Sequence, residues 1–147
     1  MNNLRITREF SFEMAHFLPG YNGPCRSVHG HSFRLFVTVS GVPSTEEGDS
    51  SFGMVMDFQQ LKKLVNKEII DKYDHALMVK KGCLDKKAMK YDGFDNVIEV
   101  PYQPTSEKMI VAFAEILKQK LPDNVSLFSL KLYETAASAV EWYRDDQ

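Results

Sequence analysis

The sequence is poor in cysteine and has no long apolar run, and both absences exclude a class of protein. Its two cysteines do not form a disulfide framework, so we expect both to be reduced. No apolar run approaches the length that spans a bilayer, and the first ten residues carry Arg5, Arg8 and Glu9, unlike a signal peptide. We therefore expect a cytoplasmic protein with no membrane segment.

The chain also lacks a large excess of charge of either sign. It has 18 Lys and Arg against 20 Asp and Glu, for a net charge of −2, which argues against nucleic acid or an anionic membrane as the main partner. There is no glycine-rich dinucleotide fingerprint and no internal repeat. At 147 residues and 44% hydrophobic, residues 1–147 fit a single domain that buries about two thirds of its unfolded surface.

Two kinds of hydrophobic spacing indicate the fold class. Period-two alternation, which predicts strands, occurs in four segments: 6–16, 32–41, 125–134 and 139–144. Apolar residues at helical spacing occur in two segments, 58–71 and 106–121, and 96–100 is a short strand candidate. The order strand, strand, helix, helix, strand, strand predicts an α+β fold. We expect a four-stranded antiparallel sheet with two helices on one face.

Both predicted helices have recognisable starts. Asp57 with Gln60 three residues later resembles a capping box. Thr105 and Ser106 supply an N-cap hydroxyl, and Glu107 is an acid in the first turn. Glu107 is read either as a surface acid favoured by the helix dipole or as a ligand-binding residue.

Three of the four histidines share one face of the predicted strands. His16 has the parity of apolar Phe12 and Met14, and His29 and His31 have the parity of the apolar residues that follow them. Three inward imidazoles from two strands form a cup for Zn²⁺, with a fourth position left to water or substrate. The alternative is that they are core histidines hydrogen-bonded to the backbone.

Glu134 ends an otherwise apolar row on a predicted strand, with Phe128, Leu130 and Leu132 on the same face. A buried acid needs a partner, and the two adjacent N–H donors of a pterin or guanine edge would match its two oxygens. The alternative is a strand end at which the carboxylate points to water.

Two further places could carry proton transfer. Cys25 lies four residues before His29, where its thiol beside a metal would be a usable base or nucleophile, although a single cysteine can also be a small buried hydrophobe. Asp74 and His75 offer a carboxylate beside an imidazole, which is not specific by itself. The lysines of 80–90 indicate a solvated face, with phosphate binding as the alternative.

Six short motifs, taken in order, resemble the 6-pyruvoyltetrahydropterin synthase family, and more closely its bacterial 6-carboxytetrahydropterin synthase branch. They are Phe12-Glu13-Met14-Ala15-His16, Cys25-x-x-x-His29-Gly30-His31, Gly53-Met54-Val55-Met56-Asp57-Phe58, Asp74-His75, Pro104-Thr105-Ser106-Glu107 and Glu134-Thr135. The three residues between Cys25 and His29 favour the bacterial branch. Residues 76–103 depart from the family's pattern, and we assign no role to Cys83.

The resemblance implies a tunnelling fold that assembles as a homo-oligomer, a trimer or hexamer, with active sites at subunit junctions. It implies a small-molecule pterin triphosphate substrate, 7,8-dihydroneopterin triphosphate, converted to 6-carboxytetrahydropterin with release of acetaldehyde and triphosphate. The alternatives are a 6-pyruvoyltetrahydropterin synthase and a non-catalytic pterin- or purine-binding module. The residues it implies are zinc ligands His16, His29 and His31, catalytic Cys25, Asp74 and His75, and pterin-binding Glu134, Thr105, Ser106 and Glu107.

Overall fold

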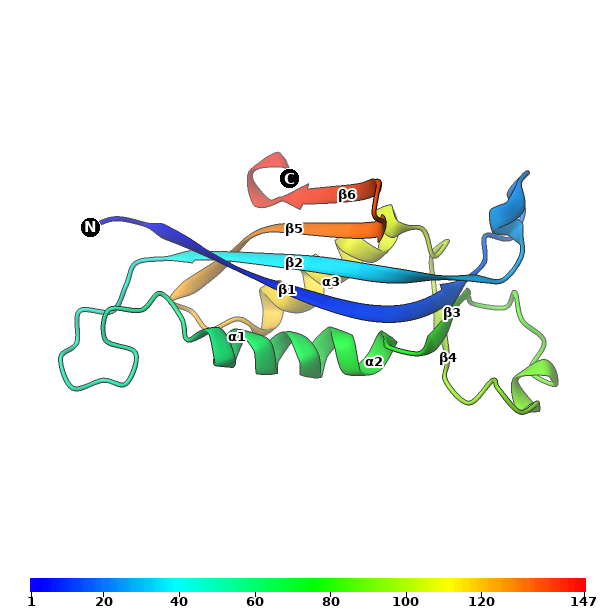
Figure 1. Cartoon of the computed structure of the whole chain (residues 1–147), viewed down its shortest axis with the longest axis horizontal. Coiled ribbons are helices and arrows are strands. Elements are labelled where there is room, and N and C mark those ends of the chain that lie inside the picture. Colours follow the sequence, from blue (N-terminus) through cyan, green and yellow to red (C-terminus); the bar gives the residue numbers. More distant parts are fainter.

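The computed structural model describes all 147 residues and is built around one six-stranded sheet, in the order β4-β3-β1-β2-β5-β6 (Figure 1). The strands are β1 (Leu4–His16), β2 (His29–Gly41), β3 (Ala76–Lys80), β4 (Val97–Val100), β5 (Val125–Thr135) and β6 (Ser138–Tyr143). The α-helices are α1 (Phe58–Val65), α2 (Asp71–Tyr73) and α3 (Ser106–Lys120). The three helices share one core with the inward residues of the sheet, since Leu61 of α1, Tyr73 of α2 and Phe113 of α3 all belong to it, so the predicted α+β class is confirmed.

The expected four-stranded antiparallel sheet is correct only for β1, β2, β5 and β6. The sheet is mixed, because β3 runs parallel to β1 and β4 runs parallel to β3. The sequence hid β3 because Ala76, Met78 and Val79 are all buried, which removes the alternation that marks a half-exposed strand. β3 pairs with β1 only over residues 14–16, so residues 4–13 of β1 have no strand partner on that edge.

The long pair β1 and β2 brings the histidines together. The register runs without interruption from Leu4 opposite Gly41 to His16 opposite His29. Phe12 and Phe33 face each other across the pair and stack with ring centroids 5.0 Å apart, and both are almost fully buried. Because side chains alternate between the two faces of a strand, His16 and His31 lie on the same inward face as these rings.

Strand β5 contains an extra residue that the sequence did not reveal. Thr38 of β2 pairs with Ser129 and Val39 pairs with Leu127, so Phe128 is left over as a bulge. The expectation that Phe128 shares the inward face with Leu130 is therefore wrong. Leu127 is buried instead, and the Phe128 ring lies against the Arg5 guanidinium, 3.7 Å from its centroid.

The predicted helix 58–71 is one continuous helical stretch that changes character along its length. Asp57 caps α1 by accepting from the Gln59 N–H at 2.7 Å, while the reciprocal bond from Gln60 that a capping box requires is absent. A π-helical turn, Asn66–Ile70, joins α1 to α2. Thr105 caps α3 as expected, accepting from the Lys108 N–H.

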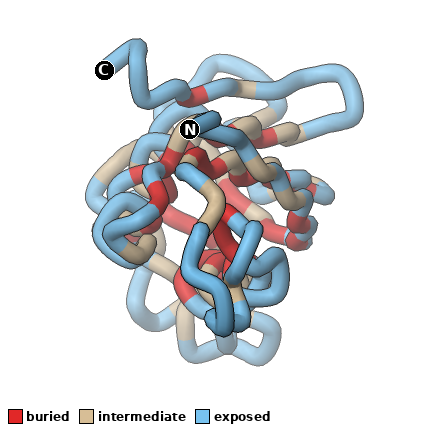
Figure 2. The backbone as a smooth tube through the Cα atoms, turned by 90° about the vertical axis from the view of Figure 1, so that its left-hand side faces the viewer, coloured by how far each residue is buried: buried red, intermediate tan, exposed pale blue.

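The helices and sheet enclose a core of 26 buried hydrophobic residues. In Figure 2 the buried stretches of backbone, in red, lie toward the middle of the molecule and the exposed ones, in pale blue, toward the outside. Phe113 of α3 is fully buried and packs edge-on against Phe12 of β1 and obliquely against Tyr73 of α2. This contact joins both helical stretches to the strand that carries His16. None of the helices has the length and apolar composition that a membrane crossing requires.

Candidate metal centre and ligand pocket

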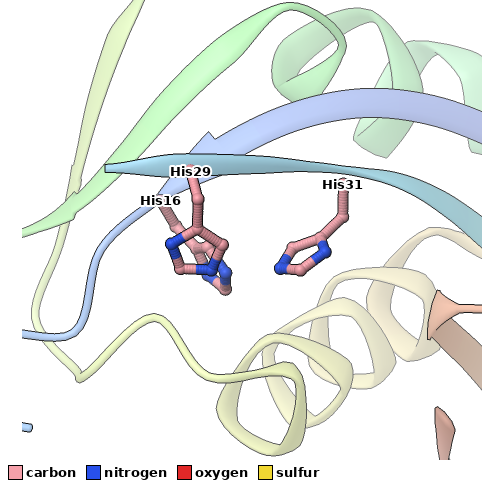
Figure 3. Close-up of side chains that lie close together, drawn as sticks. All are labelled: His16, His29 and His31. Atoms are coloured by element: carbon pink, nitrogen blue, oxygen red, sulfur yellow. The ribbon is translucent and has the colours of Figure 1, made fainter. Parts of the chain in front are cut away.

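The three predicted ligand histidines converge at one end of the sheet. His16 is the last residue of β1, His29 is the first of β2 and faces it, and His31 follows two residues later on the same side. Their ring centroids lie 4.6 to 5.1 Å apart, and one ligand atom from each lies within 4.8 Å of the others. Figure 3 shows all three rings on the same side of the ribbon, above the start of α3. We call these residues the histidine cup.

Backbone carbonyls fix the orientation of two of the rings. His16 Nδ1 lies 2.7 Å from the Pro104 carbonyl and His29 Nδ1 lies 2.7 Å from the Ser27 carbonyl. Each Nδ1 must carry the proton to donate to a carbonyl, which leaves Nε2 with its lone pair. The Nε2 atoms of all three histidines are buried without a hydrogen-bond partner.

Three buried, unpartnered imidazole nitrogens facing one point fit a cation that prefers nitrogen ligands. The alternative of ordinary core histidines satisfied by the backbone accounts for two Nδ1 atoms and leaves every Nε2 unexplained. Burial lowers the pKa of His16 and of His31, with the Glu134 charge opposing the shift at both. Neutral imidazole is the form that binds a metal.

Glu134 lies beside the cup, between it and α3. Its Oε1 comes within 3.3 Å of His31 Nε2 but does not form a hydrogen bond with it, and its Oε2 accepts from the buried Ser106 hydroxyl. The β5–β6 pairing slips between Tyr133 and Thr135, so Glu134 lies at an irregularity of the strand. Bulges of this kind re-aim side chains near functional sites.

Ser106 and Glu134 line a hollow of about 190 Å³ that Glu107 also borders. Ser106 at the start of α3 therefore lies against Glu134 of β5. The Thr105 hydroxyl caps α3 by accepting from the Lys108 N–H, so this side chain stabilises the helix start. Glu107 is exposed at the rim.

Cys25 lies in the loop of residues 17–28, which joins β1 to β2 and which we call the Cys25 loop. It is the middle residue of a 3-10 turn, Pro24–Arg26, and is half-buried. The group of side chains that could hold a metal contains the three histidines alone, so Cys25 is near the cup in sequence and does not belong to that group.

Asp74 and His75 form a side-chain pair next to Glu13 of β1, on the outward side of this strand. Asp74 Oδ1 accepts from the Glu13 N–H at 2.8 Å, its Oδ2 lies 3.0 Å from His75 Nδ1, and the His75 N–H donates to the Glu13 carbonyl. The Glu13 N–H, and then the His75 side chain, lower the pKa of Asp74. His75 has a positive φ of 61°, which a non-glycine residue rarely adopts.

The surroundings of this pair are the outward-facing residues of β1 and β2, on the side of the sheet opposite to the cup. His75 is exposed and borders a hollow of about 320 Å³ together with Glu13 and Ser32, which face each other across β1 and β2. Their side chains alternate with the inward residues, and the Ser32 hydroxyl donates to the Glu13 carboxylate. The Asp74–His75 pair therefore borders the outward side of β1 and β2, in a hollow whose lining also includes His31, whereas the unpartnered Nε2 atoms of the cup lie on the inward side.

Three groups at the site were missed from the sequence. The carbonyls of Pro104 and Ser27 orient the rings, and backbone groups have no signature in residue type. Gln103 donates from its side-chain amide to the Pro19 carbonyl at 3.1 Å. Its place beside the Pro104-Thr105 motif was the only available signal.

Comparison with known proteins gives one family. The sequence profile described as 6-pyruvoyl tetrahydropterin synthase matches residues 5–145. The 6-carboxy-5,6,7,8-tetrahydropterin synthase of Haemophilus influenzae is 33% identical over 147 residues, covering 94% of this chain and 97% of that protein. The protein of the same name from Synechocystis is 34% identical over 139 residues, covering 94% and 92%.

Solved structures agree on the fold. The crystal structure of 6-pyruvoyl tetrahydropterin synthase from Plasmodium vivax gives a TM-score of 0.73 at 17% identity, covering 98% of this chain and 99% of that one. The Caenorhabditis elegans 6-pyruvoyl tetrahydropterin synthase gives 0.69 at 24% identity, covering 97% and 96%. At these identities the likeness concerns the architecture.

Proposed function

Because this chain belongs to the 6-pyruvoyl tetrahydropterin synthase family, we propose that it is a zinc-dependent carbon–carbon lyase of the 6-carboxy branch. It converts 7,8-dihydroneopterin triphosphate to 6-carboxy-5,6,7,8-tetrahydropterin, releasing acetaldehyde and triphosphate, as a step toward 7-deazaguanines such as the queuosine precursor. The resemblance inferred from six motifs is confirmed by the family match and by relatives of that name. The chain is thus an enzyme similar to 6-carboxytetrahydropterin synthases.

One observation supports the metal more than any other: the three Nε2 atoms of the histidine cup are buried together with no partner. Leaving several polar atoms buried and unsatisfied costs about 1–3 kcal/mol each, so a folded chain needs a reason to do so. Three neutral imidazoles leave a fourth coordination position, which is the arrangement of catalytic zinc sites. A zinc ion bound there supplies Lewis acidity toward the oxygens of the substrate side chain.

We assign substrate binding to the Glu134 hollow. The amino-pyrimidinone edge of a pterin offers two adjacent N–H donors, which a carboxylate accepts as a pair. Ser106 occupies one lone pair of Oε2 and leaves others free, so it orients the carboxylate without blocking it. Glu107 borders the hollow, and Thr105 contributes through the α3 cap that places Ser106 and Glu107.

We assign proton transfer to Cys25, with Asp74 and His75 as its partners. Asp74 next to His75 Nδ1 favours the tautomer with the proton on Nδ1, which leaves Nε2 as a base. Since the pair borders the outward side of β1 and β2 while the cup faces inward, we infer that a second copy of the chain brings His75 to the cup of its neighbour. The strand edges of β6 and of residues 4–13 of β1 are free for assembly into a homo-oligomer, a trimer or hexamer.

The test is an assay of zinc-loaded protein with 7,8-dihydroneopterin triphosphate, followed by mass spectrometry of the products. We expect 6-carboxytetrahydropterin, acetaldehyde and triphosphate. A product that retains the side-chain carbons would instead identify a 6-pyruvoyltetrahydropterin synthase, the alternative that the name of the matching family favours. Absence of triphosphate release would refute both.

Two pairs of variants then separate an enzyme from a non-catalytic binding module. Cys25→Ala should lower turnover by several orders of magnitude with zinc content unchanged, while Cys83→Ala, at the exposed cysteine, should not. Asp74→Asn should slow turnover, and Asp71→Asn, at an exposed position of α2, is its control. Equal activity in all four variants would contradict the assigned roles.

A further inference from the structure

Residues 103–104 hold two separate parts of the proposed site. The Pro104 carbonyl accepts from His16, a member of the cup, and the Gln103 amide donates to the Pro19 carbonyl in the Cys25 loop. The Gln103 carbonyl accepts from the Thr105 N–H at 2.7 Å, which fixes the turn that leads into α3. One short segment, more than 80 residues away in sequence, therefore contacts both the metal ligand and the loop.

The Cys25 loop has little else to hold it in place. Most of residues 20–28 are exposed, and the other hydrogen bonds of residues 17–26 lie within the loop itself. Among these, the Leu18 N–H donates to the Cys25 carbonyl at 2.8 Å. The Pro19 carbonyl lies only two peptide units after the Leu18 N–H, so the bond from Gln103 restrains the same short stretch of chain to which Cys25 is tied.

We propose that Gln103 is a positioning residue that holds the Cys25 loop in place relative to the histidine cup. It touches neither metal nor substrate in this role, and acts by keeping the Cys25 thiol where protons are transferred. The inference rests on the proposed function for its effect on turnover. Its effect on the loop stands on the hydrogen bonds alone.

Hydrogen exchange of the zinc-loaded chain measures the loop directly. Gln103→Ala removes the donor, and Gln103→Glu keeps the size of the side chain but presents a carboxylate to the Pro19 carbonyl. Gln119→Ala, at an exposed glutamine of α3 without a side-chain hydrogen bond, is the matched control. In peptides that cover residues 17–28, we expect both Gln103 variants to exchange about fivefold faster, as loss of one neutral hydrogen bond implies.

Three exchange results would overturn the proposal. They are unchanged exchange in both Gln103 variants, faster exchange in Gln103→Ala alone, and an equal increase in Gln119→Ala. Faster exchange throughout β1 and β2 with loss of zinc would also overturn it, since Gln103 would then support the whole fold.

Kinetics supply the second readout. We expect kcat to fall about fivefold in both Gln103 variants while KM and zinc content stay within twofold of wild type, because the substrate pocket and cup keep their own contacts. A faster loop with unchanged kcat, or a change confined to KM, would refute positioning. If wild-type protein released no triphosphate, the proposed function would fail, and the exchange result would still decide whether Gln103 holds the loop.

Discussion

The hydrogen bond from Ser106 to Glu134 offers a quantitative test of the ligand pocket. Ser106→Ala removes the hydroxyl that donates to Glu134 Oε2 and leaves the α3 cap intact, because the cap belongs to Thr105. Hydrogen bonds to a charged group contribute about 1.5–3 kcal/mol. The Glu134 side chain is 29% exposed, so water can replace part of the lost bond and the lower end of that range applies.

We therefore expect Ser106→Ala to weaken binding of the pterin edge by about 1.5 kcal/mol, which is roughly tenfold in Kd. The assay is a fluorescence titration of zinc-loaded protein with neopterin, which carries the edge without the triphosphate. Zinc content should not change, because His16 and His29 keep the carbonyls that orient them.

Two further variants make this result decisive. Ser106→Thr keeps a hydroxyl and should restore most of the affinity, whereas Ser126→Ala makes the same change at an exposed position of β5 and should have no effect. A Kd for Ser106→Ala within twofold of wild type would refute the assignment of Glu134 as the anchor of the pterin. So would an equal loss in Ser126→Ala.

Other predictions concern the metal, the pH dependence and the core. His29→Ala should lower zinc from one ion per chain to a small fraction by elemental analysis, and should abolish the drop in melting temperature that a chelator causes in wild type. In the metal-free chain, burial holds the pKa of His16 and of His31 below the ordinary 6.5, so the unfolded chain takes up protons first as pH falls. Urea denaturation should therefore show the free energy of unfolding decreasing from pH 7 to pH 5, by at most about 1.4 kcal/mol per pH unit for each histidine, and a flat profile would contradict this. In the same assay, Phe113→Ala should lower the free energy of unfolding by about 3–5 kcal/mol. Val111→Ala, at a position of α3 that is 46% exposed, should lower it by under about 0.5 kcal/mol. Similar losses in the two variants would contradict the described core.

The histidine cup could be predicted from sequence because strand alternation is a local rule. His16, His29 and His31 have the parity of neighbouring apolar residues, and the uninterrupted β1–β2 register preserves that parity to the end of both strands. The start of α3 followed equally from the cap chemistry of Thr105. In both cases the signal lies within a few residues of the feature.

What could not be predicted depends on contacts between distant segments. Strand β3 is buried on both faces at the consecutive residues Met78 and Val79, so it shows no alternation, and its parallel pairing follows from the crossover rather than from composition. The carbonyl of Pro104 that orients His16 is invisible in residue type. The face on which His75 lies is set by bonds to the Glu13 backbone, which adjacency to Asp74 does not reveal.

The bulge in β5 determines where this strand tolerates a change of length. Removing Phe128 would leave Leu127 and Ser129 adjacent and still opposite Val39 and Thr38, so both halves of the strand would keep their facing. Loss of any one residue from 129–133 would instead rotate Glu134 to the opposite side of the sheet. Among deletions of one residue in the part of β5 that precedes Glu134, we therefore expect natural variants to tolerate only the deletion of Phe128.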